Sequence, residues 1–412
     1  MRILVLGSGA REHAIVKALL AEGADHEITA APGNAGIALE TPVVALDPTN
    51  GDVVAQYALD NAIDLVVIGP EAPLVAGVGD KLRTRGIPVF GPSKAAAALE
   101  GSKTFAKRIM DEAGVPSGKA IRAGTIAEAT EAIDEYGAPY VVKADGLAAG
   151  KGVLVSADRN AAIAHAMYWL QHGDVLIEEF LSGEEVSLFL LSDGHSVLPL
   201  SPAQDYKRAL DRDEGPNTGG MGSYSPLPWL PPGFVDEVID TIALPTIRQL
   251  AAEQKPFIGL LYCGLILTSK GIRVIEFNAR FGDPETQVVL PRLLTPLSGL
   301  LFAAATGGLG SLPRPEFSDE VAVAVVLASE GYPDDPITGR KITGLDRVRD
   351  VTIDHAATAA SGDSFVATGG RVLSVVALGD TFANARGKVY AALAEISLPG
   401  GHYRTDIAEK VS

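Results

Sequence analysis

Residues 141–153, Val-Val-Lys-Ala-Asp-Gly-Leu-Ala-Ala-Gly-Lys-Gly-Val, are the most distinctive stretch of the sequence. They predict an apolar strand that ends at Lys143, then a Gly/Ala loop that leads into a second strand. Glycines let backbone amides approach phosphate oxygens, and a lysine adds a point charge. Gly146 and Gly150 are one residue too close for a Walker A loop, which also has Ser or Thr where Gly152 stands. The stretch indicates either a phosphate-binding loop of another kind or a flexible hairpin with solvated lysines.

The composition is that of an ordinary globular protein with several domains. Hydrophobic residues make up 47% and charged residues 21% of the 412 residues, which excludes a disordered or fibrous chain. A typical domain of about 150 residues gives two to four domains. The net charge of −17 argues against nucleic acid and membrane surfaces as partners. The one cysteine, Cys263, excludes an internal disulfide and favours a reducing, cytoplasmic location.

The first 100 residues predict an open parallel sheet covered on both faces. Short apolar runs without alternation are separated there by helical segments. Glycine and proline follow each run, at the sheet edge where such folds bind small molecules. The expected strands are 3–6, 28–30, 65–68 and 88–90, and the expected helices are 12–22, 52–60 and 75–85.

The turn Gly7-Ser8-Gly9 precedes the first expected helix and can hold an anion on its backbone N–H groups. A dinucleotide fold would have a third glycine at the position of Glu12 and an acid after the second strand, where the sequence reads Ala31-Pro32-Gly33. An NAD-dependent oxidoreductase is therefore disfavoured. A phosphorylated small molecule is the better ligand for this turn, and a tight turn made for packing alone is the other interpretation.

Residues 274–285 contain the candidate metal ligands. Strand alternation places Glu276, Asn278 and Arg280 on one face and Ile275 on the other. A carboxylate and an amide oxygen suit Mg²⁺, with Mn²⁺ as a second candidate. The guanidinium can neutralise a phosphoryl group during transfer. The pattern therefore predicts a metal-assisted phosphoryl-transfer site and disfavours a protein that only senses nucleotides.

Three polar stretches complete the candidate site. Residues 177–187 place four glutamates at a domain crossover, where they can accept hydrogen bonds from an adenine amino group or from ribose hydroxyls. Residues 204–208 and the Gly-rich stretch 215–222 indicate a substrate loop. Each stretch read alone is also compatible with a solvated turn or loop.

Taken together, these segments resemble the glycinamide ribonucleotide synthetase family of the ATP-grasp superfamily. The resemblance covers essentially the whole chain, and the matching segments follow the family's order. They are GSGAREHA (7–14), APGNAG (31–36), GPEAPLVAG (69–77), FGPSKAAAALEGSK (90–103), VVKADGLAAGKGV (141–153), IEEFLSGEEVS (177–187), GPNTGGMGSYSP (215–226), IEFNARFGDPETQ (275–287) and TGGRVLSVVALG (368–379).

The resemblance implies a multidomain fold of α/β and α+β parts. An N-terminal open parallel α/β substrate domain would cover residues 1–100, and a C-terminal mixed domain residues 318–412. The ATP-grasp core would combine a central domain, residues 101–114 and 182–311, with a small lid, residues 115–181. ATP would lie between the lid and the central domain.

The resemblance also implies the reaction. ATP would drive ligation of glycine to 5-phosphoribosylamine through glycyl phosphate, giving glycinamide ribonucleotide, ADP and phosphate in de novo purine (IMP) biosynthesis. Another ATP-grasp carboxylate–amine ligase acting on a phosphorylated small molecule is the alternative. We expect a cytoplasmic monomer that uses Mg²⁺ and ATP and acts only on small molecules.

The site residues follow from the same resemblance. Arg280 would stabilise the acyl-phosphate step, with Lys143 as the second catalytic residue, and Glu276 and Asn278 would ligate the metal. ATP would be bound by Lys103, Lys143, Gly146, Gly150, Lys151, Gly152, Glu178, Leu181 and Glu185. The substrates would be bound by Gly9, Arg11, Glu71, Asp205, Lys207, Asn217 and Gly219.

The sequence departs from the superfamily at two places. Many ATP-grasp enzymes carry a metal-binding acid on the strand before the Glu-x-Asn motif, and here that position is Gly264. The segment 170–174 is also short, which would affect how the lid closes. The first departure puts a second metal position in doubt, and neither removes a residue named above.

Overall fold

The N-terminal part is a parallel four-stranded sheet, as predicted, and its strand order is β2-β1-β3-β4. The computed structural model describes residues 1–146 and 151–412. Every residue of β3 is buried, as are five of the six residues of β1, so both faces of the sheet are covered. The strands are β1 (Arg2–Gly7), β2 (Glu27–Pro32), β3 (Leu65–Ile68) and β4 (Val89–Phe90).

Helices flank this sheet, and one expected helix is divided in two. The helix predicted over 75–85 is broken at Gly77, whose φ of 84° is left-handed and ends a helix readily. The segment 94–101, which had no predicted helix, forms one after an N-cap at Ser93. The helices are α1 (Ala10–Ala21), α2 (Gly51–Asp60), α3 (Glu71–Ala76), α4 (Val78–Thr84) and α5 (Lys94–Gly101).

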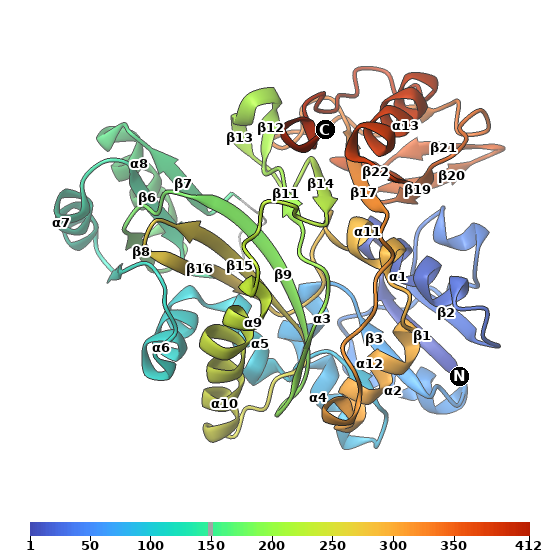
Figure 1. Cartoon of the computed structure of the whole chain (residues 1–412), viewed down its shortest axis with the longest axis horizontal. Helices are drawn as coiled ribbons and strands as arrows, with labels where there is room; N and C mark the ends of the chain where they lie inside the picture. The colour runs from blue at the N-terminus through green and yellow to red at the C-terminus, as the bar shows by residue number, and fades with distance from the viewer. Residues whose placement is uncertain (147–150) are drawn as a thin grey trace.

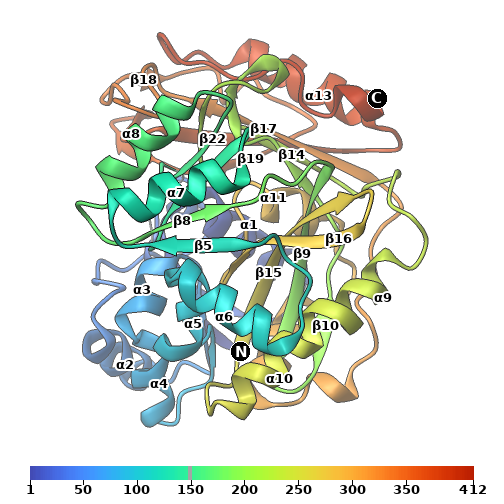
Figure 2. The ribbon, with the colours of Figure 1, turned by 90° about the vertical axis from the view of Figure 1, so that its left-hand side faces the viewer.

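A small antiparallel sheet with two helices forms the part of the chain that we expect to be the lid, and it is called the lid below. It lies on the left in Figure 1 and faces the viewer in Figure 2. Its core, which includes Ala129, Ile133, Val142 and Ile177, is separate from the two larger clusters of the molecule. The lid can therefore keep its packing as a unit. Its elements are β5 (Ala120–Ala123), α7 (Ile126–Tyr136), β6 (Tyr140–Ala144), β7 (Val153–Ser156), α8 (Arg159–Trp169) and β8 (Val175–Glu178).

The central sheet is antiparallel, in the order β10-β9-β15-β16. It stands between the lid and the N-terminal part (Figure 1), and its strands share one core cluster with those of the N-terminal sheet. The four strands are β9 (Glu184–Asp193), β10 (Val197–Pro199), β15 (Ile258–Thr268) and β16 (Gly271–Asn278). The helices of this central part are α6 (Lys103–Ala113), α9 (Phe234–Val238), α10 (Leu244–Ala252), α11 (Thr286–Val289) and α12 (Leu297–Thr306).

The C-terminal sheet takes two strands from the middle of the chain. Its order is β11-β14-β17-β22-β19, and the strands β11 and β14 flank the Gly-rich stretch 215–222. That stretch was expected within the central region, so its attachment to the C-terminal sheet is new. The five strands are β11 (Gln204–Asp205), β14 (Gly222–Ser225), β17 (Val321–Ala328), β19 (Thr352–His355) and β22 (Arg371–Gly379).

The remaining elements surround this sheet. β12 and β13 form a hairpin, and β18, β21 and β20 form a separate three-stranded sheet. Within the ranges described, no helix is long and apolar enough to cross a membrane. The elements are β12 (Arg208–Leu210), β13 (Glu214–Asn217), β18 (Lys341–Ile342), β20 (Thr358–Ser361), β21 (Ser364–Ala367) and α13 (Phe382–Glu395).

Glu12 fills the turn that follows β1, where a dinucleotide fold would have its third glycine. Its carboxylate accepts a hydrogen bond from the Gly9 backbone N–H at 2.6 Å and one from Arg11 at 2.5 Å. A Cβ on Gly7 or Gly69 would lie 2.5 or 2.2 Å from the Glu12 side chain. Gly7 at the end of β1 and Gly69 after β3 therefore make room for a buried carboxylate.

We predict that Gly69→Ala lowers the free energy of unfolding by about 1–3 kcal/mol, because overpacking a buried site forces its neighbours to shift. Chemical denaturation measures the effect. Gly299→Ala is the control, since an added Cβ there meets nothing within 4 Å and alanine favours the helix. Wild-type stability in Gly69→Ala would contradict the packing described for Glu12.

Candidate functional site

One cavity of about 720 Å³ brings together most of the predicted site residues. Its walls come from the lid, the central sheet, helices α5 and α6, and the stretch 204–219. The predicted residues that line it are Glu71, Lys103, Lys143, Gly146, Gly152, Glu178, Leu181, Glu185, Asp205, Lys207, Asn217, Gly219, Glu276, Asn278 and Arg280.

Three predicted residues of the described chain are not among those lining the cavity. Gly9 and Arg11 lie in the N-terminal part, where Arg11 donates to the Phe281 carbonyl oxygen at 3.2 Å, next to the cavity wall. Lys151 is exposed, and Gly150 lies outside the described residues. The Gly9 N–H is engaged by Glu12, so an anion at this turn would need other donors.

Glu178, at the end of β8, is buried between two lysines. The Lys143 Nζ lies 2.8 Å from one of its carboxylate oxygens, and the Lys107 Nζ lies 3.5 Å from the other. Lys143 also donates to the Ile275 carbonyl oxygen at 3.1 Å. A buried charge needs partners, and here the partners come from β6 in the lid and α6 in the central part.

Lys103 adds a third cation, and its Nζ donates to the Gly146 carbonyl oxygen at 3.0 Å. Burial lowers the pKa of Lys103 and of Lys107, while neighbouring carboxylates, Glu276 and Glu178 respectively, oppose the shift. Sequence reasoning missed Lys107, although its position four residues after Lys103 places both on one face of α6. The three lysines thus line one side of the cavity with ammonium groups, which suit phosphates.

Glu276 and Asn278 both line the cavity from β16, as their alternation predicted. Ile275 was expected on the opposite face, which is wrong. β15 and β16 pair through Gly264 with Glu276 and then Leu265 with Val274. Ile275 is therefore an extra residue in a bulge, which turns it toward the cavity.

The Glu276 and Asn278 side chains fit a divalent cation that keeps part of its water shell. Within residues 1–146 and 151–412, neither makes a hydrogen bond to protein, and no cluster of three or more His, Cys, Asp or Glu side chains could hold a metal. A Cβ on Gly264 would lie 3.1 Å from the Glu276 Cγ. Two oxygen donors in a cavity suit Mg²⁺.

Arg280 is held by two carboxylates that flank it. Its Nη2 lies 3.0 Å from Glu100 and its Nε 3.4 Å from Glu71. Burial disfavours charge in Glu71, but Arg280 and Arg11 outweigh it and lower the pKa of Glu71. Burial raises the pKa of Glu100. The Arg280 Nε–H is buried and donates no hydrogen bond to the described residues, although a Glu71 oxygen lies 3.4 Å away.

Glu100 was not predicted. Its carboxylate accepts the Ala279 N–H at 2.7 Å and thereby ties α5 to the segment that carries Arg280. The only signal in the sequence was an acid in the segment FGPSKAAAALEGSK, for which no helix was predicted.

Lys207 pairs with Glu185 and lies 3.3 Å from Asp205. Lys207 lowers the pKa of Glu185, although burial acts against it. Tyr262 and Glu285, joined by a 2.8 Å hydrogen bond, lie beside this group and were also missed. Together these side chains form a second cluster of charges, with more acids than bases.

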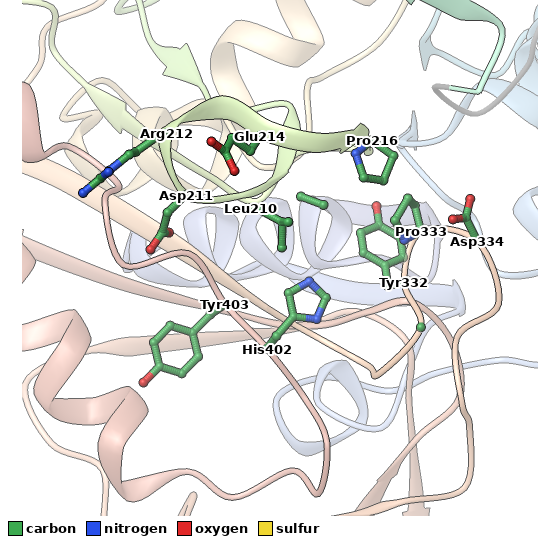
Figure 3. A pocket seen from close by; sticks show the side chains of 12 residues that line it. Leu210, Asp211, Arg212, Glu214, Pro216, Tyr332, Pro333, Asp334, His402 and Tyr403 are labelled. Carbon is green, nitrogen blue, oxygen red and sulfur yellow. The ribbon is translucent and has the colours of Figure 1, made fainter.

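A second cavity of about 700 Å³ lies between the β12–β13 hairpin and loops of the C-terminal part. Figure 3 shows Tyr332 and His402 on one wall and Asp211, Arg212 and Glu214 on the other. No predicted site residue is among the residues that line it, so the candidate active site is the cavity under the lid.

Comparison with known proteins connects these features. Models of three domains of phosphoribosylglycinamide synthetase match consecutive parts of the chain: the N domain at residues 1–100, the ATP-grasp (A) domain at 101–286 and the C domain at 322–410.

Full-length relatives agree. Phosphoribosylamine–glycine ligases of Leifsonia xyli and Streptomyces coelicolor are 72% and 55% identical to the chain, each over 100% of both proteins. The crystal structure of the phosphoribosylamine–glycine ligase of Thermotoga maritima is 34% identical, with a TM-score of 0.85 over 98% of this chain and 100% of that one.

We predict a pH dependence from Asp205, because burial raises the pKa of its carboxyl to about 7. The folded state then binds this proton more tightly than the unfolded state, so stability falls as pH rises from about 4 to about 7. The slope is at most about 1.4 kcal/mol per pH unit.

Denaturation at several pH values between about 5 and 7.5 measures this slope. Asp205→Asn should flatten it, and the exposed Asp236→Asn should leave it unchanged. Equal slopes in wild type and Asp205→Asn would contradict the prediction.

Proposed function

The chain belongs to the phosphoribosylglycinamide synthetase family, and we propose that its lid-covered cavity ligates glycine to 5-phosphoribosylamine at the expense of ATP. One observation carries the assignment of the site: three lysines, a Glu–Asn pair and a flanked arginine converge on one cavity. The product is glycinamide ribonucleotide, an intermediate of de novo purine biosynthesis, with ADP and phosphate released.

The ligation takes two steps. An oxygen of the glycine carboxylate attacks the γ-phosphorus of ATP. The bond between this phosphorus and the bridging oxygen breaks, which gives glycyl phosphate and releases ADP. The amine of 5-phosphoribosylamine then attacks the acyl carbon, phosphate leaves with the bonding electrons, and the nitrogen loses a proton. Activation is needed because an amine does not displace oxide from a carboxylate at neutral pH. No protein nucleophile is required, so catalysis rests on positioning and charge neutralisation.

The lysine side of the cavity holds the nucleotide in this proposal. Lys103 and Lys143 bind ATP phosphates, and Lys107, which shares Glu178 with Lys143, adds to the same positive field. The family resemblance implies that Glu178 and the Leu181 backbone bind adenine and that Glu185 binds the ribose. The loop residues Gly146, Gly150, Lys151 and Gly152 close over the phosphates. Closure matters because glycyl phosphate is hydrolysed in open water.

Glu276 and Asn278 hold the metal ion, Mg²⁺ or Mn²⁺, in this proposal. When bound, the ion neutralises phosphate charge and orients the terminal phosphoryl group. Arg280 is the residue that stabilises the acyl-phosphate step. Glu71 and Glu100 flank its guanidinium and fix its orientation.

The remaining predicted residues form the side that receives the substrates. Gly9, Arg11 and Glu71 serve 5-phosphoribosylamine, and Asp205, Lys207, Asn217 and Gly219 line the substrate stretch. We place the enzyme in the cytoplasm as a monomer. A single cysteine, which is buried, supports a reducing compartment, and the acidic net charge argues against nucleic acid and membranes as partners.

The proposed reaction predicts that ADP release from MgATP requires both glycine and 5-phosphoribosylamine, the latter generated in situ from ribose 5-phosphate and ammonia. Alanine in place of glycine should give no product. A coupled ADP assay with each component omitted in turn measures this. Release without the amine would indicate uncoupled hydrolysis of glycyl phosphate, and no release from folded, ATP-binding protein would refute the substrate assignment.

The assignment of Arg280 and Glu276 predicts that Arg280→Ala and Glu276→Ala each lower the rate of ADP formation by at least about 100-fold, because an electrostatic contact to the reacting group is lost. Circular dichroism should show that both variants fold. Arg314→Ala, which removes an exposed arginine paired with Asp236, is the control. Near-normal turnover in either cavity variant would remove that residue from the site.

A further inference from the structure

Arg371, the first residue of β22, reaches from the C-terminal sheet to the rim of the active cavity. We propose that Arg371 is a positioning residue of the ligase, which holds the substrate stretch at Gly219 and the cavity residue Asp283 in register. It acts through these two residues and is not itself among those that line the cavity. The inference rests on the proposed function and adds a role for the C-terminal domain.

The guanidinium of Arg371 joins two segments that are far apart in the sequence. Its Nη1 donates to the carbonyl oxygens of Gly219 and Asp283 at 2.6 and 2.8 Å, and its Nη2 lies 3.2 Å from the Asp283 carboxylate. The planar guanidinium of arginine can donate to several acceptors at once in a fixed geometry, whereas the ammonium group of lysine cannot. Both Gly219 and Asp283 line the active cavity.

Gly219 allows this contact because it has no side chain. A Cβ there would lie 3.0 Å from the Arg371 Cζ, so the guanidinium lies directly against the glycine. The Gly219 N–H donates to the Tyr332 hydroxyl at 2.9 Å. Side chains of the C-terminal part thus engage both backbone polar groups of one cavity residue.

The second cavity lies behind this contact. Tyr332 stands on its wall (Figure 3), and the Tyr332 ring packs on Gly370, where a Cβ would lie 2.2 Å from the ring. Gly370 immediately precedes Arg371. The TGGRV segment therefore uses its second glycine to seat Tyr332 and its arginine to reach the cavity.

The N-terminal part fixes the sheet that carries Arg371. The His355 N–H in β19 donates to the His13 Nδ1 at 2.8 Å, and the Asn34 amide donates to the His355 carbonyl oxygen at 2.7 Å. β19 is paired with β22, with His355 opposite Leu373. Two side chains from the motifs GSGAREHA and APGNAG thus dock the C-terminal sheet in the position from which Arg371 reaches Asp283.

The contacts of Arg371 lie on the substrate side of the cavity. The Asp283 carboxylate that Arg371 contacts lies beside the turn at Gly9, where a Cβ would be 3.8 Å from it. Burial opposes ionisation of Asp283, but Arg371 and Arg11 lower the pKa of its carboxyl. Asp283 thus joins Arg371 to residues proposed to receive 5-phosphoribosylamine. None of the three lysines of the nucleotide side contacts Arg371 in the described chain. Loss of Arg371 should therefore affect the substrates more than the nucleotide.

The test compares Arg371→Ala with wild type in the full-length enzyme. The variant should bind MgADP within about 2-fold of wild type by calorimetry, and kcat/KM for 5-phosphoribosylamine should fall roughly 100-fold, the cost of a small misplacement of a reacting group. Added guanidinium ion at millimolar concentration should restore part of the rate. Arg347→Ala, which removes an exposed arginine of the same domain paired with Glu395, should behave as wild type.

Two outcomes for Arg371→Ala would overturn the proposal. The first is a wild-type kcat/KM. The second is a parallel loss of MgADP affinity and rate without rescue, because that result would indicate a general structural role. If Arg371→Ala does not fold, Arg371→Lys decides: unchanged MgADP affinity with reduced kcat/KM supports the proposal, and wild-type kinetics refute it. If the wild-type enzyme releases no ADP with glycine and the amine, the proposed function itself is refuted. That result is distinguishable from a failure of the Arg371 proposal, which concerns only the difference between variant and wild type.

Discussion

The buried carboxylate of Glu178 is the constraint on which the arrangement of the active cavity depends. A charge in that position is tolerated only with partners at short range, and its partners come from two different parts of the molecule. Lys143 belongs to the lid, and Lys107 belongs to α6 of the central part. Because the lid has a hydrophobic core of its own, this ion cluster is a specific tie between lid and core, and it places the lysines where phosphates are proposed to bind.

The sequence was most informative where local pattern decides the structure. The parallel sheet of the first 100 residues followed from apolar runs and helical segments, and strand alternation placed Glu276 and Asn278 on the cavity side of β16. The errors have local physical causes. Gly77 adopts a left-handed φ that divides a helix, and a bulge opposite Gly264 turns Ile275 inward. Alternation cannot reveal an extra residue, because the bulge is set by the partner strand.

Long-range partners could not be predicted from the same patterns. Glu100 lies in a segment for which no helix was predicted, and its role is revealed only when α5 packs beside the segment that carries Arg280. β14 pairs with β17, about a hundred residues later in the chain. The Gly-rich stretch 215–222 is therefore attached to the C-terminal sheet for reasons that no local pattern contains. Family resemblance supplied the site residues, but it did not supply the side chains that hold them in place.

The charges of the cavity are divided unequally between their contact groups, and the division matches the proposed chemistry. Two lysines, Lys107 and Lys143, share the Glu178 carboxylate, and Lys103 adds a third cation near Glu276. Arg280, in contrast, is flanked by two carboxylates. Polyphosphate gains most from the first group. In the second, the carboxylates offset much of the arginine's charge and fix its plane, so that its directional N–H donors matter more than its net field. A donor preorganised in this way needs little reorganisation when charge develops on the transferring group. The two carboxylates that lower the local positive field are therefore also the groups that fix the orientation of the Arg280 guanidinium.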